Sequence, residues 1–451
     1  MADTSPQRAL LVAVEAGGAP RRARPEADEP SPEESLAELR LLAETAGAQV
    51  VGTVIQSRRE WSPATLIGEG KAREIERLRQ EQGFDLVIFD EELSPSQQRN
   101  LEAIINCGIL DRTALILDIF ARRARTREAR VQVELAQLQY RLPRLTGRGV
   151  DLSRLGGGIG TRGPGETRLE IDRRRIRERI AHLRRELQEV AAHRERQRAG
   201  REENRVPLVT LAGYTNAGKS TLHRRLAGSD AYVEDRLFAT LDTMVRRVEP
   251  PDGEPLLLAD TVGFIRKLPH TLVAAFRSTL EEVVRADLIL HVVDVSHPAR
   301  DRQMDAVQAV LDEIGAGDRP RLVVLNKLDR LRDMLGEDGA RAEVERLRHR
   351  FPGAVAVSAV TGEGFPELSR AIQDALGRRR AVVEALVPYP MAHLAAFIHQ
   401  RGRVLAEEYR AGGVFIRAEM ETSLADRVRA ALGPPGTARN GQGAPAERSG
   451  R

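Results

Sequence analysis

The residues with the clearest chemistry form three short motifs. Residues 213–220 read Gly-Tyr-Thr-Asn-Ala-Gly-Lys-Ser, residues 260–263 read Asp-Thr-Val-Gly, and residues 326–329 read Asn-Lys-Leu-Asp. The first is a P-loop pattern, in which glycines let backbone N–H groups surround phosphate oxygens. A single match of this kind also arises by chance, so the inference rests on the order and spacing of all three motifs. Together they predict a site for GTP or GDP.

Each motif supplies a different part of that site. Lys219 should reach the β- and γ-phosphates, and the Ser220 hydroxyl should ligate Mg²⁺. Asp260 should hold Mg²⁺ through water, while the Gly263 N–H meets the γ-phosphate. The Asp329 carboxylate can accept hydrogen bonds from guanine N1–H and the 2-amino group, a pair of donors that adenine lacks. The predicted selectivity is therefore for guanine.

Further residues complete the predicted site. Residues 358–362 read Ser-Ala-Val-Thr-Gly and fit a loop that closes over guanine O6. Thr240 is expected to complete the Mg²⁺ coordination while the γ-phosphate is present, with Thr243 as a competing candidate. The predicted metal-binding members are Ser220, Thr240 and Asp260. The full predicted nucleotide-binding set is Gly213, Tyr214, Thr215, Asn216, Ala217, Gly218, Lys219, Ser220, Thr221, Phe238, Ala239, Thr240, Asp260, Thr261, Val262, Gly263, Asn326, Lys327, Asp329, Ser358, Ala359 and Val360.

No catalytic side chain is assigned. Many GTPases carry a glutamine after Asp-x-x-Gly to orient the attacking water, but Phe264 stands there and cannot do so. We therefore predict hydrolysis that is slow alone and faster with a partner. Asn216 lies beside the expected β- and γ-phosphates, and one hypothesis gives it a role in binding K⁺. The alternative is that its amide only stabilises the loop.

The elements that must position these motifs alternate along the chain. Apolar runs predict buried parallel strands at 206–212, 256–259, 287–294, 321–325 and 354–357, and a helix is predicted at 220–227. Strands that alternate with helices imply an α/β fold with a doubly wound sheet and ligand at the carboxyl ends of the strands. The three motifs follow predicted strands, as such a site requires.

The segment before this domain predicts a helical hairpin. Apolar residues recur at steps of three and four, with one step of seven after Leu169, in two stretches: Val131, Leu135, Leu138, Leu142 and Leu145, then Leu169, Ile176, Ile180, Leu183, Leu187 and Val190. Each set is the seam of a long helix, so an antiparallel coiled coil is expected. The glycine-rich residues 156–165 link the two helices.

The charge of this hairpin indicates an RNA partner. Residues 121–205 hold 23 Arg and no Lys against 12 acidic residues, a net charge of +11, whereas the whole chain is +4. Such a basic element on an otherwise acidic protein is typical of nucleic-acid binding, and the near absence of aromatics favours phosphate contacts with structured RNA. A solvated helical face is the alternative. The RNA-binding candidates are Arg154, Arg162, Arg168, Arg173 and Arg174.

Composition limits the remaining possibilities. The single cysteine, Cys107, excludes an internal disulfide framework, and no apolar run suggests a membrane span or signal peptide, so we expect a cytoplasmic protein. We also expect it to be a monomer. Strands at 49–55 and 84–89 and helices at 70–82 and 95–105 are predicted for an N-terminal α/β domain. The predicted parts are a flexible extension (1–35), that domain (36–120), the hairpin (121–205), the G domain (206–378), a small C-terminal α/β domain (379–432) and a disordered tail (433–451).

These motifs together resemble the HflX family of translational GTPases. The resemblance covers about residues 36–430 and is carried by residues 90–99, 155–172, 213–221, 238–242, 260–264 and 326–329, with the glycine-rich 155–172 the most specific. It implies a GTPase that binds the 50S ribosomal subunit and splits stalled or idle 70S ribosomes, particularly under heat stress, with the N-terminal domain and hairpin on ribosomal RNA. The family also carries a hydrophobic residue at the place of Phe264. One departure is Thr243, where relatives often have proline.

Three other functions remain open at this point. A signalling GTPase without a nucleic-acid partner agrees least with the charge of the hairpin. A GTP-dependent factor in large-subunit assembly would favour immature particles over intact ribosomes. A tRNA-modification GTPase would need a further catalytic domain that the sequence does not show.

Overall fold

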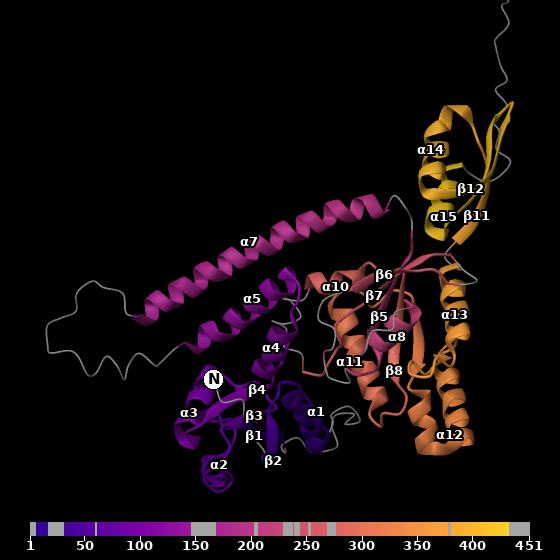
Figure 1. Cartoon of the computed structure of the whole chain (residues 1–451). Helices are drawn as coiled ribbons and strands as arrows, with labels where there is room; N and C mark the ends of the chain where they lie inside the picture. The colour runs from indigo at the N-terminus through magenta and orange to yellow at the C-terminus, as the bar shows by residue number, and fades with distance from the viewer. Residues whose placement is uncertain are drawn as a thin grey trace, which may run out of the picture. The chain divides into compact units, whose positions relative to one another are not determined.

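The computed structural model describes residues 6–16, 31–58, 61–145, 168–202, 206–228, 238, 244–250, 254–267, 277–377 and 380–432. The chain divides into two compact units, residues 1–369 and 370–451, and their boundary falls within helix α13 (Phe365–Gly377). Figure 1 shows the elements in chain order. The limits proposed above for the individual domains stay predictions.

The N-terminal part of the first unit is a parallel sheet with the strand order β2-β1-β3-β4. The predicted strands and helices of this region are all present. The elements are β1 (Arg8–Ala16), α1 (Pro32–Thr45), β2 (Gln49–Arg58), α2 (Glu69–Gln82), β3 (Leu86–Phe89), α3 (Pro95–Ile105), β4 (Gly108–Asp111) and α4 (Arg112–Arg123). Ser31 and Ser94 start α1 and α3 with capping boxes, which satisfy backbone N–H groups at both helix starts.

Strand β1 corrects one sequence-based prediction. Residues 1–35 were predicted to be a flexible extension, but residues 8–16 form a strand that pairs with both β2 and β3. Residues 9–12 are buried, as expected of an inner strand covered on both faces. The Pro- and Arg-rich composition that suggested flexibility belongs to residues that follow this strand.

Helices α5 (Arg127–Arg144) and α7 (Arg168–Glu202) form the predicted antiparallel hairpin (Figure 1). The ion pairs Arg127–Glu186 and Arg179–Glu134 join the two helices. The later residue of α5 pairs with the earlier residue of α7, so the helices are antiparallel. Most of the predicted seam forms one cluster, whereas Leu145, Leu169 and Val190 are half-buried and lie beyond it. The cluster contains Val131, Leu135, Ile180 and Leu183, with Leu138, Leu142, Ile176 and Leu187 packed against it.

Helix α5 has a second buried face that the seam alone does not predict. Ala129, Val133 and Ala136 belong to the same buried cluster as Phe120 of α4 and Leu39 of α1. These three residues are spaced by four and three positions, so they lie on one side of the helix. The first hairpin helix is therefore also part of the N-terminal domain's core.

The G domain is a six-stranded sheet with the order β10-β9-β8-β5-β7-β6. All pairs are parallel except β6 with β7. The strands predicted from apolar runs are present, but the exposed edge strand β6 was not predicted. The elements are β5 (Leu208–Gly213), α8 (Lys219–Leu226), β6 (Met244–Val248), β7 (Leu256–Asp260), α10 (Arg277–Val284), β8 (Leu288–Asp294), α11 (Arg300–Glu313), β9 (Arg321–Asn326), α12 (Leu328–Arg350) and β10 (Val355–Ala356), before α13.

The second unit is a small antiparallel sheet with helices packed on it. Its strand order is β11-β13-β12, and Val383, Ile398 and Ile416 are at the centre of its core. Its elements are β11 (Arg380–Val387), the short 3₁₀ helix η1 (Tyr389–Met391), α14 (Ala392–Arg401), β12 (Gly402–Arg410), β13 (Gly413–Glu421) and α15 (Thr422–Leu432). None of the helices within the described residues combines the length and the apolar character that a membrane span requires.

Replacement of Leu183 by alanine tests the hairpin seam. Leu183 is fully buried, so Leu183→Ala should destabilise the packing of α5 and α7 by about 2–4 kcal/mol and speed amide hydrogen exchange in both helices. The matched control is Leu169→Ala, the same truncation in the same helix outside the seam cluster. Equal exchange in the two variants would contradict the seam.

Candidate functional site

The P-loop has the close backbone packing that its glycines allow. Gly213 ends β5 with φ of 158°, and a Cβ there would lie 2.3 Å from the carbonyl oxygen of Val292 on β8. Gly218 has φ of 92°, and a Cβ would lie 2.2 Å from Nδ2 of Asn326. Neither position accepts a side chain without displacing its neighbour. The loop shape is thus set by contacts with β8 and with the end of β9.

The Asp-x-x-Gly segment lies directly against this loop. The Phe264 N–H donates to the Gly213 carbonyl at 3.1 Å, and the Thr215 N–H donates to the Phe264 carbonyl at 2.7 Å. A Cβ on Gly263 would lie 3.1 Å from Lys219 Nζ, so this backbone approaches the lysine closely. Gly263, whose N–H is predicted to contact the γ-phosphate, therefore lies beside Lys219, the predicted phosphate-binding lysine.

Lys219 is held at the centre of the site. It is buried, and its Nζ donates to the carbonyl oxygens of Gly213 at 2.9 Å and Tyr214 at 2.7 Å. Burial lowers the pKa of Lys219 to about 8, and the Asp260 carboxylate only partly opposes this effect. A bound phosphate would raise this pKa again, because an adjacent anion favours the ammonium form.

The guanine-specificity motif is linked to both neighbouring loops. Asn326 donates from Nδ2 to the Ala217 carbonyl at 2.7 Å and accepts from the Ala359 N–H at 3.0 Å. Asp329 accepts from the Ser358 hydroxyl at 2.6 Å, which fixes one carboxylate oxygen. Lys327 has φ of 66°, and its Nζ pairs with Asp294 at 2.7 Å. The predicted guanine pocket is therefore a connected set of loops at the carboxyl end of the sheet.

The residues present fit a magnesium ion with a nucleotide. Ser220 follows Lys219 in the first turn of α8. Asp260 ends β7, which is the neighbour of β5 in the sheet. A hydroxyl and a carboxylate are the oxygen donors that Mg²⁺ prefers, with phosphate oxygens and water in the remaining positions. Such an ion would neutralise charge on the β- and γ-phosphates.

Some predicted site residues lie elsewhere or outside the described residues. The Phe238 ring is buried and packs edge-on against Phe120 of α4, with centroids 4.7 Å apart, so this side chain is a core residue rather than part of the phosphate site. Val360 is exposed, and its carbonyl is held by Arg225. The described residues do not include Ala239, Thr240, the competing Thr243, Arg154 or Arg162.

The remaining candidates for RNA binding belong to α7. Arg168 begins this helix, Arg173 is half-buried, and Arg174 is exposed at 3.9 Å from Glu178. Their contact with RNA stays a prediction.

Three family models match consecutive parts of the chain. They are described as GTP-binding GTPase N-terminal over residues 33–121, GTP-binding GTPase Middle Region over 123–201 and 50S ribosome-binding GTPase over 208–327. GTPase HflX of Caldanaerobacter subterraneus subsp. tengcongensis is 46% identical over 423 residues, which cover 94% of this chain and 93% of that one. This chain belongs to the HflX family of GTPases.

A second HflX protein gives the same result. GTPase HflX of Escherichia coli is 46% identical over 343 residues, which cover 76% of this chain and 79% of that protein. A crystal structure of a GTP-binding protein from the archaeon Sulfolobus solfataricus with GDP is 24% identical, covers 82% of this chain and 99% of that chain, and has a TM-score of 0.42. As an HflX-family GTPase, the protein hydrolyses GTP to GDP and phosphate.

The sequence did not reveal a second set of residues beside the P-loop. The Tyr214 hydroxyl, counted above only as part of the nucleotide motif, hydrogen-bonds Glu38 of α1. Arg112 and Lys267 form ion pairs with carboxylates of the N-terminal domain. Lys267 is one of only four lysines in the chain, a compositional signal that does not name its partner.

Replacement of Asp329 tests the guanine pocket. Asp329→Asn should weaken GDP binding about 10- to 100-fold, because a hydrogen bond to a charged group contributes about 1.5–3 kcal/mol. Affinity should shift towards xanthine nucleotides, whose 2-oxo group accepts from the new amide. The control is Asp333→Asn, the same change one turn further along α12 at an exposed position. Unchanged guanine preference in fluorescent-nucleotide titrations would exclude this role for Asp329.

Proposed function

We propose that this HflX-family GTPase acts in the cytoplasm as a monomer that binds the 50S subunit and splits stalled or idle 70S ribosomes under heat or another stress. GTP with Mg²⁺ favours the ribosome-bound state, and hydrolysis favours release. Hydrolysis is slow alone and stimulated by the ribosome. The match of residues 208–327 to a 50S ribosome-binding GTPase model supports the choice of partner.

The charge arrangement on α7 is the structural observation that carries this proposal. One side of the helix packs against α5 through Ile180 and Leu183, while Arg177 and Arg184 are exposed. These two arginines are seven residues apart, so they point to the same side of the helix. Exposed guanidinium groups on a rigid helix suit contacts with the phosphates of structured RNA.

The position after the Asp-x-x-Gly motif supports stimulation by a partner. Phe264 is buried and cannot orient a water molecule. The groups that complete the reaction must therefore come from elsewhere in the chain, from an ion or from the ribosome. A GTPase that needs a partner for fast hydrolysis suits a factor that should hydrolyse GTP only when it is bound to its target.

Ribosome splitting is tested by hydrolysis and light scattering together. GTP hydrolysis should rise on addition of 50S subunits or 70S ribosomes, and 70S scattering should fall only with GTP. A double variant, Arg177→Glu with Arg184→Glu, should lose about tenfold or more in 50S affinity and keep its ribosome-free hydrolysis rate.

The control reproduces the same charge change elsewhere. Arg341→Glu with Arg348→Glu has the same spacing on the exposed side of α12 and should behave as wild type. Stimulation without splitting would favour the alternative, a large-subunit assembly factor, and preferential binding to immature particles would establish it. If both double variants lose 50S affinity to the same extent, the hairpin arginines have no specific role in 50S binding.

Asn216 supports a second proposed cation. It has φ of 61°, is exposed, and belongs to the P-loop beside the expected β- and γ-phosphates. Its amide oxygen could ligate K⁺ together with those phosphates and supply positive charge that other GTPases obtain from an arginine.

This role predicts faster hydrolysis in K⁺ than in Na⁺ buffer. Asn216→Gly should abolish the difference and keep the left-handed loop conformation, which glycine adopts without strain. Hydrolysis rates should be measured with and without 50S subunits. Equal wild-type rates in the two salts under both conditions would exclude the ion.

A further inference from the structure

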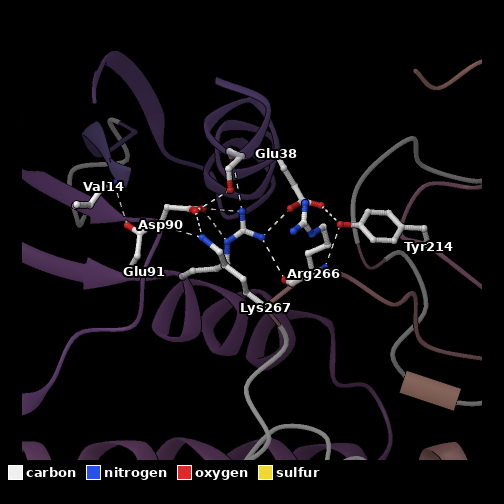
Figure 2. A network of polar contacts seen from close by, with 9 residues as sticks. Val14, Glu38, Asp90, Glu91, Tyr214, Arg266 and Lys267 are labelled. Atoms are coloured by element: carbon white, nitrogen blue, oxygen red, sulfur yellow. Dashed lines mark hydrogen bonds and ion pairs between the residues drawn. The ribbon is translucent and has the colours of Figure 1, made fainter. Parts of the chain in front are cut away.

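Arg112, the first residue of α4, is a buried cation with every donor satisfied. A guanidinium has five N–H groups, and this one makes five hydrogen bonds at 2.7–3.3 Å. Four go to the N-terminal domain, to Asp90, Glu38 and the Ser35 carbonyl. The fifth, from Nη1, goes to the Arg266 carbonyl of the G domain at 3.3 Å. Figure 2 shows this network between the two domains.

The Arg266 backbone is held at both of its polar groups. Its carbonyl accepts from Arg112, and its N–H donates to the Tyr214 hydroxyl at 3.0 Å. The same hydroxyl donates to Glu38, as Figure 2 shows. Burial and then the Glu38 carboxylate raise the pKa of Tyr214, so the phenol stays protonated and keeps this donor. Tyr214 is itself a P-loop residue, so one side chain connects the phosphate loop, Arg266 and α1.

Lys267 adds a second attachment to the N-terminal domain. Its Nζ lies 2.5 Å from Asp90 and 3.3 Å from Glu91, and its backbone has φ of 53°. A non-glycine residue keeps this left-handed conformation only where its surroundings hold it. Burial alone would raise the pKa of Asp90, but Arg112 and Lys267 outweigh it and hold this pKa below its ordinary value. The carboxylate therefore stays charged and binds both cations.

These contacts act on the segment that directly follows the Asp-x-x-Gly motif. The N–H and the carbonyl of Phe264 both hydrogen-bond to the P-loop, and residues 266 and 267 are bound by side chains of the N-terminal domain. Gly263, whose N–H is expected at the γ-phosphate, is thereby kept close to Lys219. Displacement of Arg266 would leave a buried guanidinium donor without an acceptor, which is costly. The position of Gly263 and the docking of the N-terminal domain are thus linked.

We propose that Arg112 and Tyr214 are positioning residues for the γ-phosphate: through the Arg266 backbone they hold Gly263 at the P-loop, so that selectivity for GTP over GDP depends on the N-terminal domain. The coupling is reciprocal: if docking of the N-terminal domain raises the affinity for GTP, bound GTP stabilises that docking by the same factor. A γ-phosphate therefore tightens the contact between the two domains, and a partner that moves the N-terminal domain changes the nucleotide preference.

A pocket beside the network gives this segment room to move. It has a volume of about 300 Å³ and lies between α1, the P-loop and the start of α11. Lys267, Tyr214 and Asn216 are among its lining residues. On this side residues 266 and 267 face a pocket rather than packed side chains.

The test compares affinities for GDP and a non-hydrolysable GTP analogue in the full chain without ribosomes. Arg112→Lys keeps the charge but loses the planar set of donors, and Tyr214→Phe removes only the hydroxyl. Both variants should lower the preference for the GTP analogue about fivefold or more and leave GDP affinity within about twofold. The kcat for GTP should fall in parallel, and amide exchange at residues 265–267 should become faster.

The matched control breaks a different contact between the same two domains. Arg302 of α11 pairs with Glu34 of α1 at 2.6 Å, on a different element from Arg112 and Tyr214, so Arg302→Met should leave the nucleotide preference unchanged. An equal shift with Arg302→Met would assign the effect to docking in general and overturn the role of the Arg266 backbone. Equal weakening of both nucleotides in the Arg112 and Tyr214 variants would overturn the proposal as well. Because no ribosome is present, neither outcome bears on the proposed ribosomal function.

Discussion

The nucleotide site depends on one buried amide, the side chain of Asn326. This residue ends β9, yet its two polar atoms bond to the P-loop at Ala217 and to the loop that follows β10 at Ala359. Gly218 has to lack a side chain because the amide nitrogen occupies the space where a Cβ would be. The loops for phosphate and for guanine are therefore a single structure, and neither can be reshaped without the other.

The second motif has a different kind of support. Phe264 belongs to a buried cluster that also contains Phe120 and Ile116 of α4, so the G domain and the N-terminal domain share a core at this point. Phe264, which cannot orient a water molecule, instead packs in this core and anchors the backbone next to Gly263. In this protein the segment that contains Phe264 is therefore packed against another domain.

Local patterns predicted the elements whose burial is continuous or periodic. Strands β5, β7, β8 and β9 are apolar runs, and the hairpin seam repeats at steps of three and four, so each is visible within a short window. Strand β6 was missed because its Arg-rich sequence at a sheet edge shows neither pattern. The motif residues of the nucleotide site could be predicted because phosphate and guanine binding require fixed residue types at fixed spacing.

The rest of the site could not be predicted in this way. Arg112 and Arg266 are 154 positions apart, and Tyr214 and Glu38 are 176 positions apart, so no window contains both partners. Phe238 was assigned to the nucleotide because it lies next to a switch motif, but its ring contacts Phe120 across the domain boundary. Such contacts follow from how the domains pack, which sequence spacing does not encode.

Strand β1 has a consequence for how this protein can be handled. It lies between β2 and β3, so the first strand in the described part of the chain is also an inner strand of its sheet. During synthesis β1 can pair with β3 only once residue 89 has been made, which is a non-local and therefore slow pairing. A shortened expression clone that began at residue 17 would split the sheet in two, although it would retain every residue matched by the N-terminal family model.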